Sequence, residues 1–183
     1  MQLREPVFLI GPPGSGKTTV GRLLASDFGV PFIDGDELVS QRAGIPIDEL
    51  VTNWSAQERL DAQVAMLREL FAHPTHLCSQ LREDQAPFVC AVPSGAVDAP
   101  VIQQALAKRA TYFLDVSFAD SFARTGLNAP RPVGLVAPRA LWRQLMAERR
   151  PRYLASAKWV IETNNLDVGQ VTSVLKKGLS NGN

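Results

Sequence analysis

A glycine-rich loop that ends in lysine and threonine carries the clearest chemistry in this sequence. Residues 11–18 read Gly-Pro-Pro-Gly-Ser-Gly-Lys-Thr, which fits the pattern G-x-x-x-x-G-K-[ST], and the apolar run Val7–Ile10 leads directly into it. Glycines let the main chain wrap around phosphate oxygens, so that successive N–H groups point at the anion. The predicted ligands of a nucleoside triphosphate are therefore Gly14, Ser15, Gly16, Lys17, Thr18 and Thr19.

Two side chains at the end of this phosphate loop have separate expected roles. Lys17 is expected to reach the β- and γ-phosphates, and the hydroxyl of Thr18 is expected to coordinate Mg²⁺. The residues that follow have the character of a helix, so strand, loop and helix occur in the required order. A glycine-rich turn that serves packing alone is the alternative, but the Lys-Thr pair completes the binding pattern.

Two carboxylates follow the second apolar run of the chain. Residues 32–38 read Phe-Ile-Asp-Gly-Asp-Glu-Leu, which puts Asp34 and Asp36 at the carboxyl end of a predicted strand, where parallel sheets form their sites. We expect Asp34 to face the water shell of a metal ion and Asp36 to act as general base toward an acceptor hydroxyl. Asp36 is also a candidate N-cap for the helix that begins with Glu37, and the two roles can coexist.

Short apolar runs recur along the chain and are separated by segments of helical character. They occupy residues 7–10, 30–33, 87–92, 111–116 and 158–161. This alternation predicts a three-layer α/β fold with a central, parallel, five-stranded sheet flanked by helices. Between the third and fourth runs, Asp98 is expected to cap a helix that has Pro100 in its first turn.

Residues 125–138 form a long stretch without sustained periodicity. The stretch is rich in glycine and proline and contains one conspicuous charge, Arg131. Long loops in compact domains are usually functional or disordered. We interpret the stretch as a mobile lid, with a plain surface loop as the alternative.

Size and composition indicate one globular domain over residues 1–183. The chain is 45% hydrophobic and 20% charged, which is ordinary for a soluble protein of this length. A net charge of +1 provides no broad electrostatic footprint for nucleic acid, although arginines gather between Arg139 and Arg152. No segment approaches the ~18 apolar residues of a membrane span, and the first residues lack the architecture of a signal peptide. We therefore expect a cytoplasmic protein, without nucleic-acid or membrane partners, that acts as a monomer.

Taken together, these motifs resemble the shikimate kinase family over nearly the full length of the chain. Separate segments carry the resemblance: the phosphate loop with the helix after it, residues 32–38 with 42–47, residues 124–128 with Arg131-Pro132, the Arg-x-Pro-x-Tyr element within 148–153, and residues 159–164. The ensemble is more specific than the phosphate loop alone. It implies a phosphate loop at 11–18, an acceptor-binding region at about 34–63 and a lid at about 125–138.

The resemblance also implies a reaction and a set of roles. The reaction is Mg²⁺-dependent transfer of the γ-phosphoryl group of ATP to the 3-hydroxyl of shikimate, with Asp36 holding and activating that hydroxyl. Arg149 would grip the substrate carboxylate, since a planar guanidinium can pair both carboxylate oxygens. Arg131 would close over the phosphates with the lid, and Arg124 would lie against adenine.

Two segments depart from the family's pattern. Pro93-Ser94-Gly95 replaces a glycine triplet, although the N–H of Ser94 can still reach substrate and Gly95 is retained. In the family's Phe-Arg-x-x-Glu element, Arg59 survives as a candidate carboxylate ligand, whereas its aromatic and acidic partners do not. Trp54 is a candidate replacement for the lost apolar wall.

These departures leave two alternatives open. The segment Asp34-Gly35-Asp36 also resembles gluconate kinases and adenylylsulfate kinases, although the His-Pro expected after the second aspartate in gluconate kinases is absent. The other alternative is a catalytically silent module that binds ATP. Retention of Asp36, Arg131 and Arg149 together argues against such decay.

Overall fold

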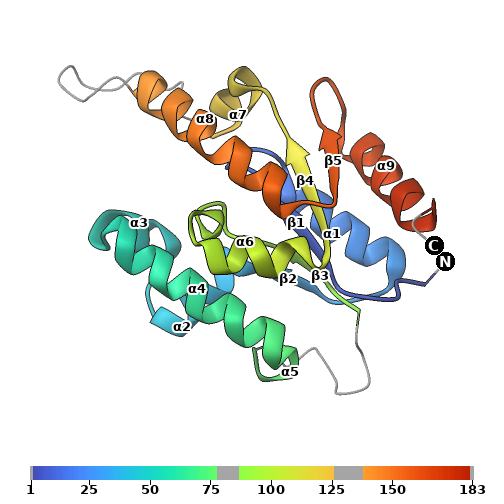
Figure 1. Ribbon diagram of the computed structural model, residues 1–183, viewed down its shortest axis with the longest axis horizontal. Coiled ribbons are helices and arrows are strands. Elements are labelled where there is room, and N and C mark those ends of the chain that lie inside the picture. Colours follow the sequence, from blue (N-terminus) through green and yellow to red (C-terminus); the bar gives the residue numbers. More distant parts are fainter. Residues whose placement is uncertain (1, 78–86, 126–137, 182–183) are drawn as a thin grey trace.

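Five parallel strands form one sheet in the order β2-β3-β1-β4-β5, and this confirms the predicted α/β fold (Figure 1). The computed structural model describes residues 2–77, 87–125 and 138–181. The strands are β1 (Val7–Ile10), β2 (Phe32–Asp34), β3 (Val89–Ala91), β4 (Ala110–Asp115) and β5 (Trp159–Glu162). Each of them overlaps one of the apolar runs, because a strand covered on both faces needs a continuous apolar stretch.

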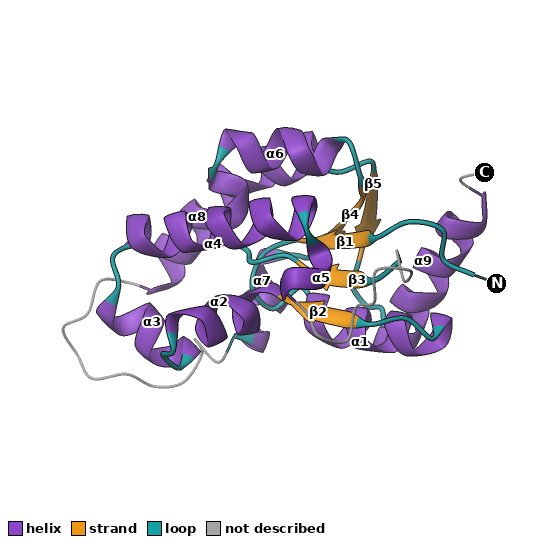
Figure 2. Ribbon diagram, turned by 90° about the horizontal axis from the view of Figure 1, so that it is seen from below, coloured by secondary structure: helices purple, strands orange, loops and turns teal. Residues whose placement is uncertain are grey.

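Helices cover both faces of this sheet. In the described part of the chain they are α1 (Lys17–Phe28), α2 (Gly35–Ala43), α3 (Ile47–Asn53), α4 (Ala56–Ala72), α5 (Pro74–Leu77), α6 (Pro100–Ala107), α7 (Phe118–Arg124), α8 (Pro138–Ser156) and α9 (Val168–Asn181), with one 3₁₀ turn, η1 (Ala96–Asp98). Figure 2 shows the sheet between α1 and α9 on one side and α4 and α6 on the other. The arrangement has the three layers that the sequence predicted.

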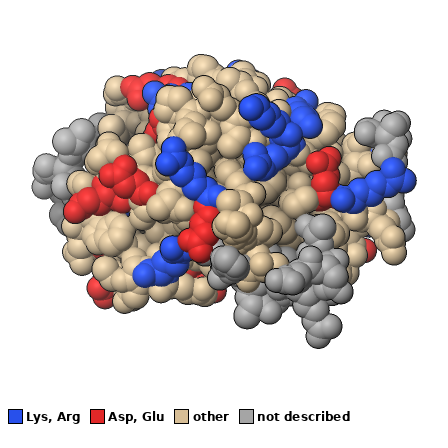
Figure 3. Space-filling model, turned by 60° about the horizontal axis from the view of Figure 1, so that its bottom comes forward, with Lys and Arg blue, Asp and Glu red and all other residues tan. Residues whose placement is uncertain are grey.

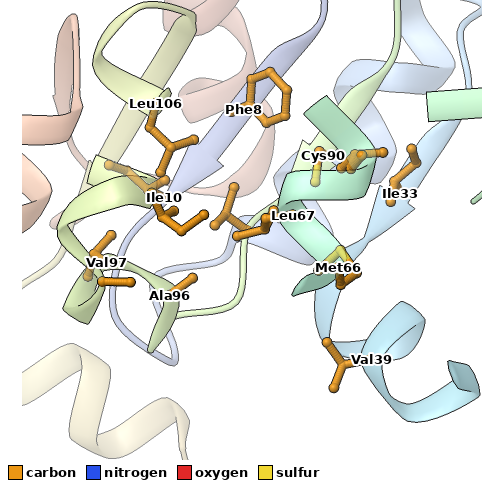
Figure 4. Close-up of a cluster of buried hydrophobic side chains, with 14 of the residues drawn as sticks. Phe8, Ile10, Ile33, Val39, Met66, Leu67, Cys90, Ala96, Val97 and Leu106 are labelled. Carbon is orange, nitrogen blue, oxygen red and sulfur yellow. The ribbon is translucent and has the colours of Figure 1, made fainter. Parts of the chain in front are cut away.

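Among the described residues, the core consists of two clusters of buried side chains, one on each face of the sheet. Phe8 and Ile10 of β1 point toward α4 and α6, where they meet residues such as Leu67 and Leu106 (Figure 4). Leu9 points to the opposite face and packs with α1 and α9. Alternate residues of one strand thus serve different layers, so β1 is buried along its whole length.

Strand register brings three loops together at one edge of the sheet. Leu9 of β1 and Asp34 of β2 both lie beside Ala91 of β3. The loops after these three strands therefore start at the same edge, which is where parallel sheets form their sites. The approach is close, because a Cβ built on Gly35 would lie 2.5 Å from Cδ of Pro93. Glycine at position 35 is what allows the turn after β2 to pack against Pro93.

Two capping predictions were wrong. The N-cap of α2 is Asp34, whose carboxylate accepts from the backbone N–H groups of Asp36 and Glu37, and Asp36 lies inside the helix. Helix α6 has Ala99 as its N-cap without a side-chain hydrogen bond, although Pro100 occupies the first turn as expected. The Asp98 side chain is instead engaged by two arginines of α8, because that ion pairing competes with capping for the same oxygens.

Charged side chains are distributed in small groups. On the face shown in Figure 3, lysine and arginine side chains lie in several separate groups with acidic side chains between them. Within the described ranges, no helix is both long enough and apolar enough to cross a membrane.

Candidate active site

A cleft of about 710 Å³ lies at the carboxyl edge of β1, β2 and β3. Most of the predicted site residues line it, namely Gly14, Gly16, Lys17, Thr18, Thr19, Asp34, Asp36, Arg59, Ser94, Gly95 and Arg149. Ser15 is buried within the phosphate loop, and Arg131 lies outside the described residues, as does most of the expected lid. The fold thus gathers residues from five separate segments of the chain into one cavity.

The phosphate loop has a conformation that glycine makes possible. Gly14 and Gly16 have φ angles of 77° and 92°, in the left-handed region that side chains with a Cβ rarely adopt. Gly16 is also the N-cap of α1, so the loop runs directly into the first turn of a twelve-residue helix. Free N–H groups at such a helix start bind anions such as phosphate.

The ammonium of Lys17 is buried beside this loop. Its Nζ donates to the carbonyl oxygens of Gly11 at 2.9 Å and Pro12 at 3.2 Å, and to Oγ of Ser94 at 2.8 Å. Desolvation lowers the pKa of Lys17 to about 8, although the carboxylates of Asp36 and Asp34 oppose the shift. The bond from Lys17 to the Ser94 hydroxyl was missed by the sequence analysis, which considered only the N–H of Ser94.

Thr18 and Asp34 form a pair of oxygen ligands across the mouth of the loop. Oγ1 of Thr18 donates to Oδ2 of Asp34 at 2.8 Å, while Oδ1 of Asp34 accepts from the two N–H groups of α2. In the part of the chain that the structure describes, no group of three or more acidic, histidine or cysteine side chains could hold a metal by itself. One hydroxyl and one carboxylate nevertheless fit Mg²⁺, which keeps several waters and takes phosphate oxygens as its other ligands.

Asp36 lines the cleft from the first turn of α2. Burial raises the pKa of its carboxyl, and the nearby Lys17 ammonium works against that rise. A carboxylate with a raised pKa accepts a proton more readily than an exposed one. The environment of Asp36 is therefore suited to a general base.

The turn that replaces the glycine triplet is held by α8. The hydroxyl of the buried Tyr153 donates to the carbonyl oxygen of Ser94 at 2.8 Å, and the N–H of Ala96 donates to the carbonyl of Pro93 at 3.0 Å. Gly95 has a φ of −78°, and among the described residues Asn165 is the one non-glycine with positive φ. This turn therefore needs no left-handed residue, which explains why proline and serine are tolerated in it.

Two predicted arginine ligands lie at the cleft with their guanidinium groups bound to the protein. Nε and Nη2 of Arg149 donate to the carboxylate of Asp98. Nη1 of Arg59 donates to the carbonyls of Val51, at 3.2 Å, and Trp54 at the end of α3. Carbonyl groups at a helix end attract cations, which accounts for the orientation of Arg59.

Arg124 lies beside the phosphate loop, and other cleft residues were missed by the sequence analysis. Nη1 of Arg124 donates to the carbonyl of Gly14 at 3.4 Å. Gln63 lines the cleft, and its buried Oε1 has no hydrogen-bond partner among the described residues. Trp142 and Leu145 complete the wall from α8. No sequence pattern distinguishes these three from other residues on helices, so only the fold identifies them.

Comparison with known proteins gives concordant matches. The family model described as shikimate kinase matches residues 13–179. The chain is 40% identical to a shikimate kinase of Salinispora arenicola, with 85% of this chain and 86% of that protein covered. It is 34% identical to a shikimate kinase of Thermobifida fusca, with 98% and 97% covered. The structure of an Acinetobacter baumannii shikimate kinase in complex with shikimate superimposes with a TM-score of 0.79, at 28% identity over 97% of this chain and 94% of that chain.

Proposed function

The chain belongs to the shikimate kinase family, and we propose that the residues of the cleft described above carry out its reaction. That reaction is the phosphorylation of shikimate by ATP. The observation that supports the assignment is the juxtaposition of Lys17, Asp36 and Arg149 in one cavity. Phosphoryl transfer to a hydroxyl needs a cation at the phosphates, a base at the hydroxyl and a grip on the acceptor, and these side chains offer one of each.

On the nucleotide side, the phosphate loop holds the polyphosphate through its N–H groups and Lys17. The Lys17 ammonium donates to two loop carbonyls and to the hydroxyl of Ser94. Its flexible side chain can exchange these partners for the β- and γ-phosphate oxygens. Arg124 provides a guanidinium plane for adenine, and Arg131 approaches the phosphates from the lid. Each added cation stabilises the charge that builds up on the transferring group.

Thr18, through its hydroxyl, and Asp34, through bound water, would hold Mg²⁺. The oxygen pair at 2.8 Å supports this assignment. When bound, the ion would screen the charge of the β- and γ-phosphate oxygens. Asp34 also receives two N–H bonds from α2, which keep the carboxylate oriented toward the loop.

On the acceptor side, Asp36 and Arg149 orient shikimate. Arg149 binds the carboxylate together with Arg59, which lines the same cleft, and the turn containing Ser94 and Gly95 contacts the ring. Asp36 accepts the proton of the 3-hydroxyl. The hydroxyl oxygen attacks the γ-phosphorus of ATP as the bond from that phosphorus to the leaving ADP oxygen breaks. Transfer is direct and in line, with positioning and charge neutralisation as the main sources of acceleration.

The assignment of Arg149 predicts a loss of acceptor affinity in Arg149→Ala. Hydrogen bonds to charged groups contribute about 1.5–3 kcal/mol, so we expect the shikimate KM to rise roughly ten- to hundredfold. The KM for ATP should stay near its original value. Steady-state ADP release, with shikimate and ATP varied in turn, measures both KM values. Gluconate is the comparison acceptor, and the variant should not prefer it to shikimate.

Arg150→Ala is the matched control for this experiment. Arg150 is the next residue of α8, is 56% exposed and pairs with Asp115 at 2.8 Å. Its replacement should leave the shikimate KM unchanged, because exposed ion pairs contribute little. An unchanged KM in Arg149→Ala itself would move the carboxylate site to another part of the cleft.

Nucleotide binding is expected to weaken above about pH 8. Because desolvation lowers the pKa of Lys17 to about 8, the ammonium is present below that pH and is progressively lost above it. Phosphates bind the cation, so the association constant should be level below this pH and fall by up to about tenfold per unit above it. Calorimetric titration with a non-hydrolysable ATP analogue across this range measures the effect. Constant affinity far into the alkaline range would contradict a lowered pKa.

The proposal treats the whole chain, residues 1–183, as one kinase domain that works as a cytoplasmic monomer. Size-exclusion chromatography with light scattering measures this directly. ATP is abundant in the cytoplasm, which is consistent with that location.

A further inference from the structure

Asp98 binds two arginines of α8 at the rim of the cleft. Its carboxylate accepts from Nε of Arg149 at 3.1 and 3.2 Å and from Nη2 of Arg149 at 2.6 Å, and it also accepts from Nη1 of Arg152. The side chains of Asp98 and Arg149 are 24% and 18% exposed. We propose that Asp98 positions Arg149 for the carboxylate of the acceptor, while Arg152 neutralises the charge of Asp98. This inference rests on the proposed function of Arg149.

Among the described residues, the hydrogen bonds of Arg149 use one edge of its guanidinium and leave the other edge available. A guanidinium has five N–H donors in a rigid plane, and Asp98 uses the side formed by Nε and Nη2. The remaining end, formed by Nη1 and the second hydrogen of Nη2, has the spacing that pairs both oxygens of a carboxylate. Nη2 lies beside the turn of the acceptor region, because a Cβ on Gly95 would be 3.5 Å from it. Asp98 therefore orients Arg149 without occupying the end that suits a substrate.

Both partners are attached to the same rigid turn. The N–H of Asp98 donates to the carbonyl of Gly95 at 2.9 Å, and Tyr153, one helical turn beyond Arg149, donates its hydroxyl to the carbonyl of Ser94. Asp98 lies in η1 and Arg149 in α8, two elements in direct contact. The ion pair thus holds the guanidinium at a fixed place relative to Ser94 and Gly95. A fixed side chain loses less conformational entropy when the substrate binds.

Arg152 determines whether Asp98 strengthens or weakens binding of the acceptor carboxylate. A lone aspartate beside Arg149 would repel the acceptor carboxylate and would weaken its binding. Because Arg152 also pairs with Asp98, through Oδ1, the three side chains together carry a net charge of +1, the same as a lone arginine. The charge that attracts the acceptor is preserved, and the benefit of orientation remains.

The effect of Asp98 should therefore appear in KM. Orientation of Arg149 helps the bound substrate and the transition state equally, and such uniform binding changes KM with little change in kcat. We expect Asp98→Ala to raise the shikimate KM about five- to tenfold, which corresponds to roughly 1 kcal/mol. The kcat and the KM for ATP should change less than about twofold. Arg152→Ala should also raise the shikimate KM, because it exposes the charge of Asp98, and added salt should reduce that increase.

A double-variant cycle tests whether Asp98 acts through Arg149. Kinetic constants are measured for Asp98→Ala, Arg149→Ala and the double variant, with Arg150→Ala as the control on the same helix. In the Arg149→Ala background, the Asp98 substitution should add nothing to the KM. Asp98→Asn keeps the size and one acceptor oxygen, and it should raise the KM about threefold. If thermal unfolding shows that Asp98→Ala does not fold, Asp98→Asn replaces it in the cycle.

The outcomes separate this inference from the proposed function. An unchanged or lowered shikimate KM in Asp98→Ala and Asp98→Asn overturns the inference, and a lowered one identifies Asp98 as a competitor of the acceptor. The same increase with and without Arg149 also overturns it, because Asp98 then acts through the turn. If Arg149→Ala alone keeps the original KM, the proposed role of Arg149 fails and the inference fails with it. If only Arg149→Ala raises the KM, the proposed function stands and the inference does not.

Discussion

Replacing Lys17 with alanine is expected to lower kcat by about three orders of magnitude, equivalent to about 4 kcal/mol of transition-state stabilisation. The ammonium is buried beside the phosphate loop, where water screens its charge weakly. Alanine removes the mobile cation that is proposed to follow charge onto the transferring phosphoryl group. The expected loss lies within the range found when a single cation is removed from phosphoryl-transfer sites.

Single-turnover ADP formation with saturating shikimate measures this loss. Lys176→Ala is the matched control, because Lys176 lies on α9 and pairs with Asp27 near the end of α1, and neither residue lines the cleft. The lowered pKa of Lys17 means that burial disfavours its charged form. We therefore do not expect Lys17→Ala to lower the midpoint of thermal unfolding. A folded Lys17→Ala variant with near-normal kcat would exclude Lys17 from catalysis.

Replacing Asp36 with asparagine is expected to lower kcat by roughly three orders of magnitude, within the range for loss of a general base. Asparagine has nearly the same shape but cannot accept the hydroxyl proton. Because Asp36 raises the pKa of Lys17, the variant should also lose nucleotide affinity at a lower pH than the original protein. Near neutral pH, binding of ATP should be largely spared.

Steady-state kinetics and the same calorimetric titration test both effects of this substitution. Glu37→Gln is the control, since Glu37 is the adjacent carboxylate, is 56% exposed and lies 3.8 Å from Arg22. Full activity in Asp36→Asn would show that another group takes the proton. A pH dependence of ATP binding identical to that of the original protein would show that Asp36 is not electrostatically coupled to Lys17.

The phosphate loop and the sheet were predictable because their signals are local. Loop conformation depends on glycines at fixed positions, of which Gly14 and Gly16 adopt left-handed angles. A short apolar run indicates each strand of the sheet, since burial on both faces disfavours polar residues. Asp34 and Asp36 could also be placed at the site, because Asp34 ends a strand and Asp36 comes two residues after it.

Capping and pairing were harder to predict, because they depend on which partners compete for the same atoms. Asp36 was a reasonable N-cap for α2, but Asp34 lies two residues earlier and takes the N–H of Asp36 itself. Asp98 precedes α6 in a suitable position, yet two charged donors on α8 outcompete neutral N–H groups for its oxygens. The competing donors are remote in sequence, so no local pattern reveals them.

By itself, the sequence determined the family, the order of strands and helices along the chain, and most of the segments that line the cleft. These features depend on spacing within segments of about ten residues, where periodicity and steric limits act. Tertiary structure alone decided that Lys17 bonds to the Ser94 hydroxyl and that Arg149 bonds to the Asp98 carboxylate, contacts that span 77 and 51 residues. Contacts of this kind form only when strand register and helix packing bring distant side chains together. The geometry of these contacts therefore depends on how the whole core packs, and no local sequence pattern reveals it.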